Sequence, residues 1–212
     1  MITLDQAKAF GAHLGAKNKA TILAHNAPSV AGILLALDTV SHVLPGVFPI
    51  TSAIRSRAEG VSVTLPTPLG TLIVLSRSAS EDAEVYAETV AHECVHAHQI
   101  QVTGGTQTAI DYLGSGELRA TREAQAYMVG LWVRHLLTGV LPTAEDALAS
   151  LGSGLYHLAA EELTLARGVV ESGLETMRRG LCPPYLVALD AHDWLRTHAH
   201  SAIVPAPWRK PP

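Results

Sequence analysis

Two histidines and a glutamate lie close together near the middle of the chain, in the run His92-Glu93-Cys94-Val95-His96. Because residues four apart project from the same face of a helix, the imidazoles of His92 and His96 can reach one metal ion. The carboxylate of Glu93 lies about 100° round the helix, beside the metal and not on it. From there it can take a proton from a zinc-bound water. The spacing therefore predicts a hydrolytic zinc centre with Glu93 as the general base.

A catalytic zinc ion uses three protein ligands and a water molecule, so one more side chain must come from elsewhere in the chain. We expect Glu123, which lies in a predicted helix that the Gly-rich turn before it could fold back antiparallel to the histidine helix. Small residues beside it, Ala124 and Ala126, allow the two helices to approach closely. Glu117 has a simpler role, because the dipole favours an acid in the first turn of a helix. The other acids in reach of this role are Asp111, Glu161 and Glu162.

The run His92-Glu93-x-x-His96-x-x-Gln99, followed by Glu123-Ala124-x-Ala126-Tyr127, resembles the gluzincin metallopeptidases. The resemblance extends to small bacterial and phage zincins, including the ImmA/IrrE-like group, and covers about residues 85 to 130. It implies that the two histidines and the downstream glutamate are zinc ligands and that the glutamate between the histidines is the base. It also implies hydrolysis of peptide bonds in a protein or peptide substrate.

Two supporting roles around the metal are less closely defined by the sequence. In some gluzincins an acid one turn after the ligand glutamate orients a ligand histidine. This chain has Tyr127 at that position, so the surroundings of the ligands must differ here, or Asp111 or Asp193 must supply the acid. Gln99 shares the helical face of His92 and either supports the site or is a polar residue at a helix end. The oxyanion needs a hydrogen-bond donor. The candidates are Tyr127, which we take as the catalytic donor, and Tyr112, Tyr156 and His157, among which the sequence does not choose.

Strands and helices that position these residues follow from periodicity and capping. Thr3-Leu4-Asp5-Gln6 is a capping box that predicts a helix to about Lys17. Alternation over residues 61–65 and an apolar run over 71–75 predict a hairpin, with a turn over 66–70. Its edge could pair with an extended peptide. Ser78 or Ser80 is expected to cap one long helix to Gln101. Other helices are expected at about 28–44, 106–113, 117–137, 143–150, 153–179 and 184–198.

These elements predict an α+β fold: a mostly helical, zincin-like domain with a small β-hairpin or sheet before the histidine helix and a C-terminal helical extension. We expect an N-terminal helical segment over residues 1–60 that packs on the core, and a catalytic core over 61–140. A C-terminal helical segment over 141–200 and a Pro-rich tail over 201–212 complete the chain.

Composition limits the classes of partner. Of the 212 residues, 48% are apolar and 16% are charged, which is typical of a globular protein. The net charge is −4 without a long basic run, so we expect no nucleic-acid partner. Cys94 and Cys182 are too few for a disulfide framework, and we expect reduced thiols. We expect no membrane span and no signal peptide, hence a protein that is cytoplasmic or exported without one.

Two other interpretations stay open at this stage. The chain could be a non-catalytic zincin, kept as a structural component of a phage or secretion-type particle, with its tail and helical extension contacting an assembly partner. It could also be a helical protein that binds no metal. Glu93 favours the peptidase, because a purely structural zinc site does not need a base. A protein, a short peptide and a peptidoglycan stem peptide all remain possible substrates.

Overall fold

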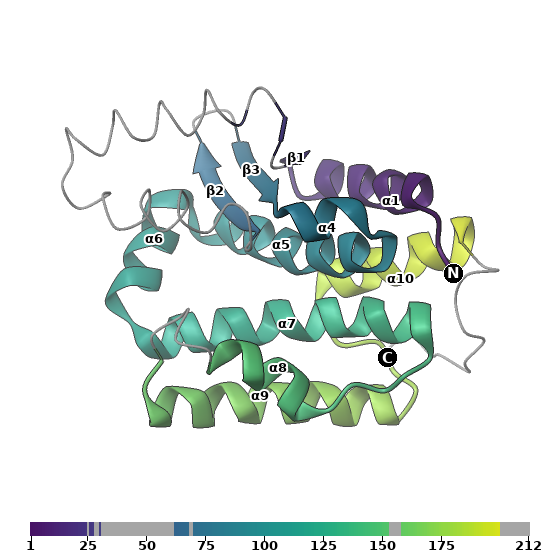
Figure 1. Ribbon diagram of the computed structural model, residues 1–212. Helices are drawn as coiled ribbons and strands as arrows, with labels where there is room; N and C mark the ends of the chain where they lie inside the picture. The colour runs from purple at the N-terminus through teal and green to yellow at the C-terminus, as the bar shows by residue number, and fades with distance from the viewer. Residues whose placement is uncertain (25, 28–29, 31–61, 68–69, 153–157, 200–212) are drawn as a thin grey trace.

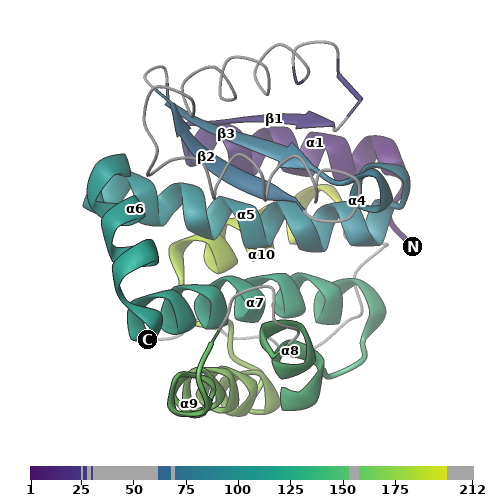
Figure 2. The same cartoon turned by 60° about the vertical axis from the view of Figure 1, so that its left-hand side comes forward.

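The computed structural model describes residues 1–24, 26–27, 30, 62–67, 70–152 and 158–199. A small sheet lies on helix α5 (Ala83–Thr103), α5 lies on α7 (Gly116–Thr138), and α7 lies on α9 (Ala160–Arg178). Figures 1 and 2 show these four tiers from two sides. The predicted α+β class, mostly helical with a small sheet before the histidine helix, is confirmed. Apart from Val30, the helix expected over 28–44 lies outside the described residues, as does the tail over 201–212.

The sheet contains the predicted hairpin and one strand that was not predicted. Strands β2 (Val63–Thr67) and β3 (Gly70–Leu75) pair antiparallel, which confirms the hairpin. The turn is shorter than expected, because β2 continues through Thr67 and β3 starts at Gly70, whose φ of 129° suits glycine. Strand β1 (Ala20–Ala24) pairs in parallel with β3, so β3 is central and β2 is an edge strand.

Helix α1 (Leu4–Lys17) begins with the predicted capping box, in which Thr3 and Gln6 exchange hydrogen bonds. The single long helix expected after Ser78 or Ser80 is wrong. The chain forms a short helix α4 (Arg77–Glu81), capped by Ser76, and α5 then starts anew. The cause is Asp82, whose extended backbone ends α4 and whose carboxylate accepts hydrogen bonds from the first amides of α5.

The remaining helices lie near their expected positions. They are α6 (Gly105–Gly114), α8 (Ala144–Leu151) and α10 (Leu186–His198), besides α7 and α9. Thr143 caps α8 with a capping box, and Gly139 ends α7 in the left-handed region. Within the described residues α9 starts at Ala160 instead of about Ser153, and residues 153–157 are outside them.

Helices α5 and α7 form the centre of the core and run antiparallel. Their facing surfaces are rich in small buried residues, which allows a close approach. At the tightest point Gly130 of α7 lies against Glu88 and His92 of α5. A Cβ atom added to Gly130 would be 3.2 Å from the Glu88 carbonyl oxygen and 3.6 Å from His92 Cβ. This contact places the two preceding turns of α7, which include Glu123, beside the histidine helix.

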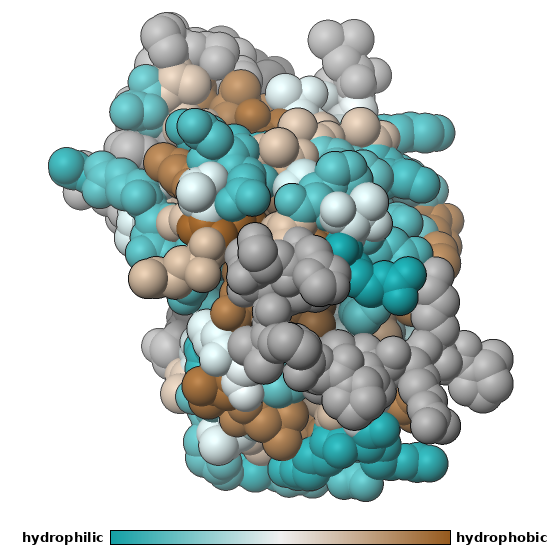
Figure 3. Space-filling model, turned by 90° about the vertical axis from the view of Figure 1, so that its right-hand side faces the viewer, coloured by the Kyte–Doolittle hydropathy of each residue, from teal (hydrophilic) through white to brown (hydrophobic). Residues whose placement is uncertain are grey.

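The surface of the described part is mixed. Figure 3 shows hydrophilic side chains over most of one face, with hydrophobic side chains gathered in a few places between them. No helix among the described residues is both long and apolar enough to cross a lipid bilayer. Cys94 and Cys182 are buried and form no disulfide.

Candidate metal centre

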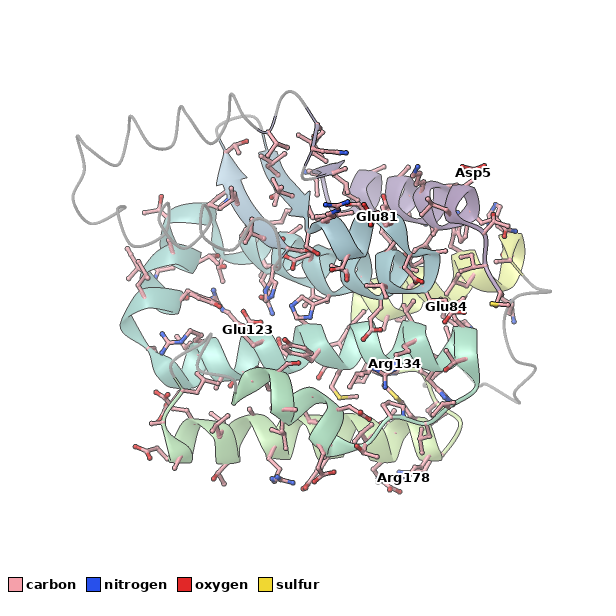
Figure 4. All side chains as sticks on the ribbon, in the orientation of Figure 1. Asp5, Glu81, Glu84, Glu123, Arg134 and Arg178 are labelled. Atoms are coloured by element: carbon pink, nitrogen blue, oxygen red, sulfur yellow. The ribbon has the colours of Figure 1, made fainter. Side chains whose placement is uncertain are left out.

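The three predicted ligands meet between α5 and α7. His92 and His96 project from α5, and their Nε2 atoms lie 3.2 Å apart. Glu123 projects from α7, and its Oε2 atom lies 3.6 Å from His92 Nε2 and 3.5 Å from His96 Nε2. Figure 4 shows Glu123 in the space between the two helices. Among the described residues these three side chains form the one group of histidine, cysteine or acid ligands that could hold a metal ion.

The two oxygens of the Glu123 carboxylate have different surroundings. Oε1 accepts a hydrogen bond of 2.7 Å from the Tyr112 hydroxyl of α6. Oε2 is fully buried, faces the two histidines and has no hydrogen-bond partner within the described residues. Burial by itself would raise the pKa of Glu123, but the facing His96 and His92 hold that pKa well below its usual range. The carboxylate is therefore ionised, and the oxygen that accepts no hydrogen bond faces the two imidazoles.

The ring of His96 is oriented from its other side by Gln99. The Nδ1 atom of His96 donates to Gln99 Oε1 at 3.1 Å, which leaves Nε2 as the atom that faces Glu123. The Gln99 amide in turn donates to Gln125 Oε1 at 3.2 Å and to the Arg122 carbonyl at 3.4 Å. Of the two roles open to Gln99 from the sequence, the structure therefore favours support of the site. Burial by itself lowers the pKa of His96, but Glu123 raises it to about 9.

The carboxylate of Glu93 is not one of the three potential ligands and reaches the edge strand of the sheet. It is 6% exposed, and its Oε2 accepts a hydrogen bond of 2.6 Å from Thr64 Oγ1 on the edge strand β2. The same hydroxyl lies 3.2 Å from the Glu93 carbonyl oxygen. Sequence reasoning missed Thr64. Its alternation with Val63 and Leu65 assigned it to one face of a strand, and no pattern links that strand to a residue 29 positions away.

The residues considered as oxyanion donors are only partly placed. The Tyr127 ring packs edge-on against the His92 ring, with centroids 4.7 Å apart and an angle of 82° between the planes. Tyr127 therefore lies beside the metal ligands, and its role as donor stays a prediction. Tyr112 is also at the site, but its hydroxyl already donates to Glu123. The other two candidates, Tyr156 and His157, lie outside the described residues.

The other acids named from the sequence have different neighbours. Asp111 forms an ion pair of 2.7 Å with Arg122. Glu117 is exposed in the first turn of α7, as its helix-dipole role predicts. Glu161 is exposed, and Glu162 accepts a hydrogen bond from the Ala159 amide at the start of α9. None of these acids, nor Asp193 of α10, belongs to the described group of potential ligands.

Comparisons of this chain with protein-family models, with curated proteins and with solved structures found no match.

Proposed function

We propose that this protein is a zinc-dependent metallopeptidase that hydrolyses peptide bonds in a protein or peptide substrate. The ligands are His92, His96 and Glu123, and Glu93 is the general base. The observation that carries the proposal is the convergence of two Nε2 atoms on one buried carboxylate oxygen that accepts no hydrogen bond within the described residues. A buried charged oxygen that accepts no hydrogen bond is costly, and a cation bound between it and the two imidazoles would remove that cost.

The spacing of the ligand atoms supports zinc. Zinc bonds of about 2.0–2.1 Å to nitrogen and oxygen in a tetrahedron require ligand atoms about 3.3–3.4 Å apart. The three observed separations are 3.2, 3.5 and 3.6 Å, so they fit with small adjustments. Imidazole nitrogen also favours zinc or another transition metal over magnesium or calcium, which prefer oxygen ligands.

The number of ligands supports catalysis over a purely structural site. Structural zinc sites are almost always closed by four protein ligands, whereas catalytic sites use three and leave a position open. The group described in this chain has three members. A purely structural site does not need a base, so Glu93 is the residue on which the proposal differs from a non-catalytic zincin that serves as a particle component.

The proposed chemistry gives each of these side chains one role. A zinc ion held by His92, His96 and Glu123 would supply a Lewis acid that lowers the pKa of water toward neutrality and polarises the scissile carbonyl. Glu93 accepts the proton of the attacking water and passes it to the leaving amine. Thr64 holds the Glu93 carboxylate in one orientation through its 2.6 Å hydrogen bond. Tyr127, beside His92, is the proposed donor to the oxyanion.

The proposal is tested with Glu93→Gln, which keeps the shape of the side chain and removes its basicity. Zinc-loaded wild type and variant are incubated with a mixed library of internally quenched peptides, and zinc content is measured on the same samples. We expect cleavage by wild type only, with equal zinc in both proteins. Equal cleavage by the variant would show that Glu93 is not the base. Zinc binding without cleavage by either protein would favour the structural zincin.

A further inference from the structure

We propose that Tyr112 is a positioning residue of the metal centre, whose hydroxyl holds Glu123 so that one carboxylate oxygen faces the histidines. The inference rests on the proposed function, because it concerns how the same site binds its metal. The two Glu123 oxygens are clearly distinguished: Tyr112 donates to Oε1 at 2.7 Å, and Oε2 is the buried atom that faces both Nε2 atoms. A single hydroxyl thus selects which oxygen is available.

Tyr112 is itself fixed at the site by α7. Helix α6, which carries it, has no fully buried residue, and polar contacts join it to α7. Arg119 of α7 donates to the Tyr112 carbonyl oxygen at 2.7 Å, and its guanidinium lies 5.9 Å from the centre of the Tyr112 ring. One residue earlier, Asp111 pairs with Arg122 at 2.7 Å.

The hydrogen bond has a consequence for coordination and another for catalysis. A carboxylate that can rotate loses conformational entropy when it binds a metal. A carboxylate that a hydrogen bond already holds in one orientation loses less, so it binds the metal more tightly. Hydrogen bonds of this kind typically contribute about 10–100-fold to metal affinity. A phenol has one hydrogen to donate, and Tyr112 uses it on Glu123. Tyr112 is therefore assigned to the metal ligand and not to the oxyanion.

The test is Tyr112→Phe, which removes the hydroxyl and keeps the ring against Arg119. The full chain is freed of metal, and its affinity for zinc is measured by competition with a chromogenic chelator. The visible spectrum of the Co²⁺ form reports the coordination of the ion. Tyr86→Phe is the matched control, since Tyr86 is a buried tyrosine that lies against Gly11 of α1 and makes no contact with Glu123 among the described hydrogen bonds. Thermal unfolding of the metal-free proteins checks that each variant folds.

We expect Tyr112→Phe to bind zinc about 10–100-fold more weakly and to change the Co²⁺ spectrum, while Tyr86→Phe matches wild type. Zinc affinity and a Co²⁺ spectrum equal to those of wild type in Tyr112→Phe would overturn the inference and leave the proposed function intact. Absence of zinc binding by wild type would overturn both. If Tyr112→Phe does not fold, Arg119→Gln provides the second test, because it removes the contact that fixes Tyr112. Unchanged affinity in that variant would contradict the inference.

Discussion

The contact between His96 and Glu123 makes the stability of the metal-free protein depend on pH. Burial by itself lowers the pKa of His96, but the facing carboxylate raises it from 6.5 to about 9 in the folded protein. A histidine whose pKa is raised by folding stabilises the protein fully below its unfolded pKa, and this contribution is lost as the pH rises through the folded pKa. The difference corresponds to about 3 kcal/mol in the free energy of unfolding at pH 6.5. About 2 kcal/mol of it is lost by pH 8.5.

Zinc binding has the opposite dependence on pH. The ion binds neutral imidazole, so the proton on His96 must leave before the metal can coordinate. Between pH 6.5 and 8.5 the neutral fraction of a group with a pKa of about 9 rises roughly 80-fold, and the apparent zinc affinity rises with it. As the pH rises over this range, the same pair of side chains therefore lowers the stability of the metal-free protein and raises its apparent affinity for zinc.

The assay is urea unfolding of the protein in a chelator at three pH values from about 6.5 to 8.5, with zinc affinity measured at each. The range stops there because burial raises the pKa of Cys94 from 9, so that thiol adds its own pH dependence at higher pH. Glu123→Gln is the control, since it removes the charge that raises the pKa of His96. Equal stability of wild type at both ends of the range would refute the reasoning. So would the same loss of stability in Glu123→Gln.

Further predictions concern the base and the helix contact. Thr64→Val should lower kcat/KM for any cleaved peptide without loss of zinc, because Glu93 loses its 2.6 Å hydrogen bond. Thr64→Ser keeps the hydroxyl and should keep the wild-type kcat/KM. A normal kcat/KM in the valine variant would show that this bond is dispensable. Gly130→Ala should destabilise the protein by about 1 kcal/mol, as overpacking against the Glu88 carbonyl exceeds the gain in helix propensity. Gly168→Ala should instead stabilise the protein by about 1 kcal/mol, because the added Cβ on α9 meets open space. Urea unfolding measures both variants, and a Gly130→Ala protein more stable than Gly168→Ala would contradict the close contact of α7 with α5.

The parts of the fold that local signals define were predictable from the sequence. Thr3 and Thr143 cap their helices as the capping-box pattern requires, and Gly139 ends α7. The placement of Glu123 opposite the histidines also follows from short-range information. The glycines at both ends of the short helix α6 let the chain bring α7 back along α5, and small residues let the helices meet.

The features that the sequence does not reveal depend on contacts between distant segments. Strand β1 has five residues and no alternation, and it is defined by parallel pairing with β3, about 50 residues later in the chain. The break at Asp82 depends on competition between two nearby caps, Ser76 and Asp82. Thr64 and Tyr112 are ordinary polar residues in the sequence. Their roles come from single hydrogen bonds to Glu93 and Glu123 across the fold.

The central claim is that His92, His96 and Glu123 bind one zinc ion. The most direct measurement is metal content per chain, by elemental analysis of wild type, Glu123→Ala and Glu117→Ala purified in parallel and offered zinc. Glu117 is the control because it is an acid of the same helix that lies exposed and outside the group. We predict one zinc in wild type and in Glu117→Ala, and a large loss in Glu123→Ala. No zinc in wild type, or equal zinc in all three proteins, would contradict the proposed site.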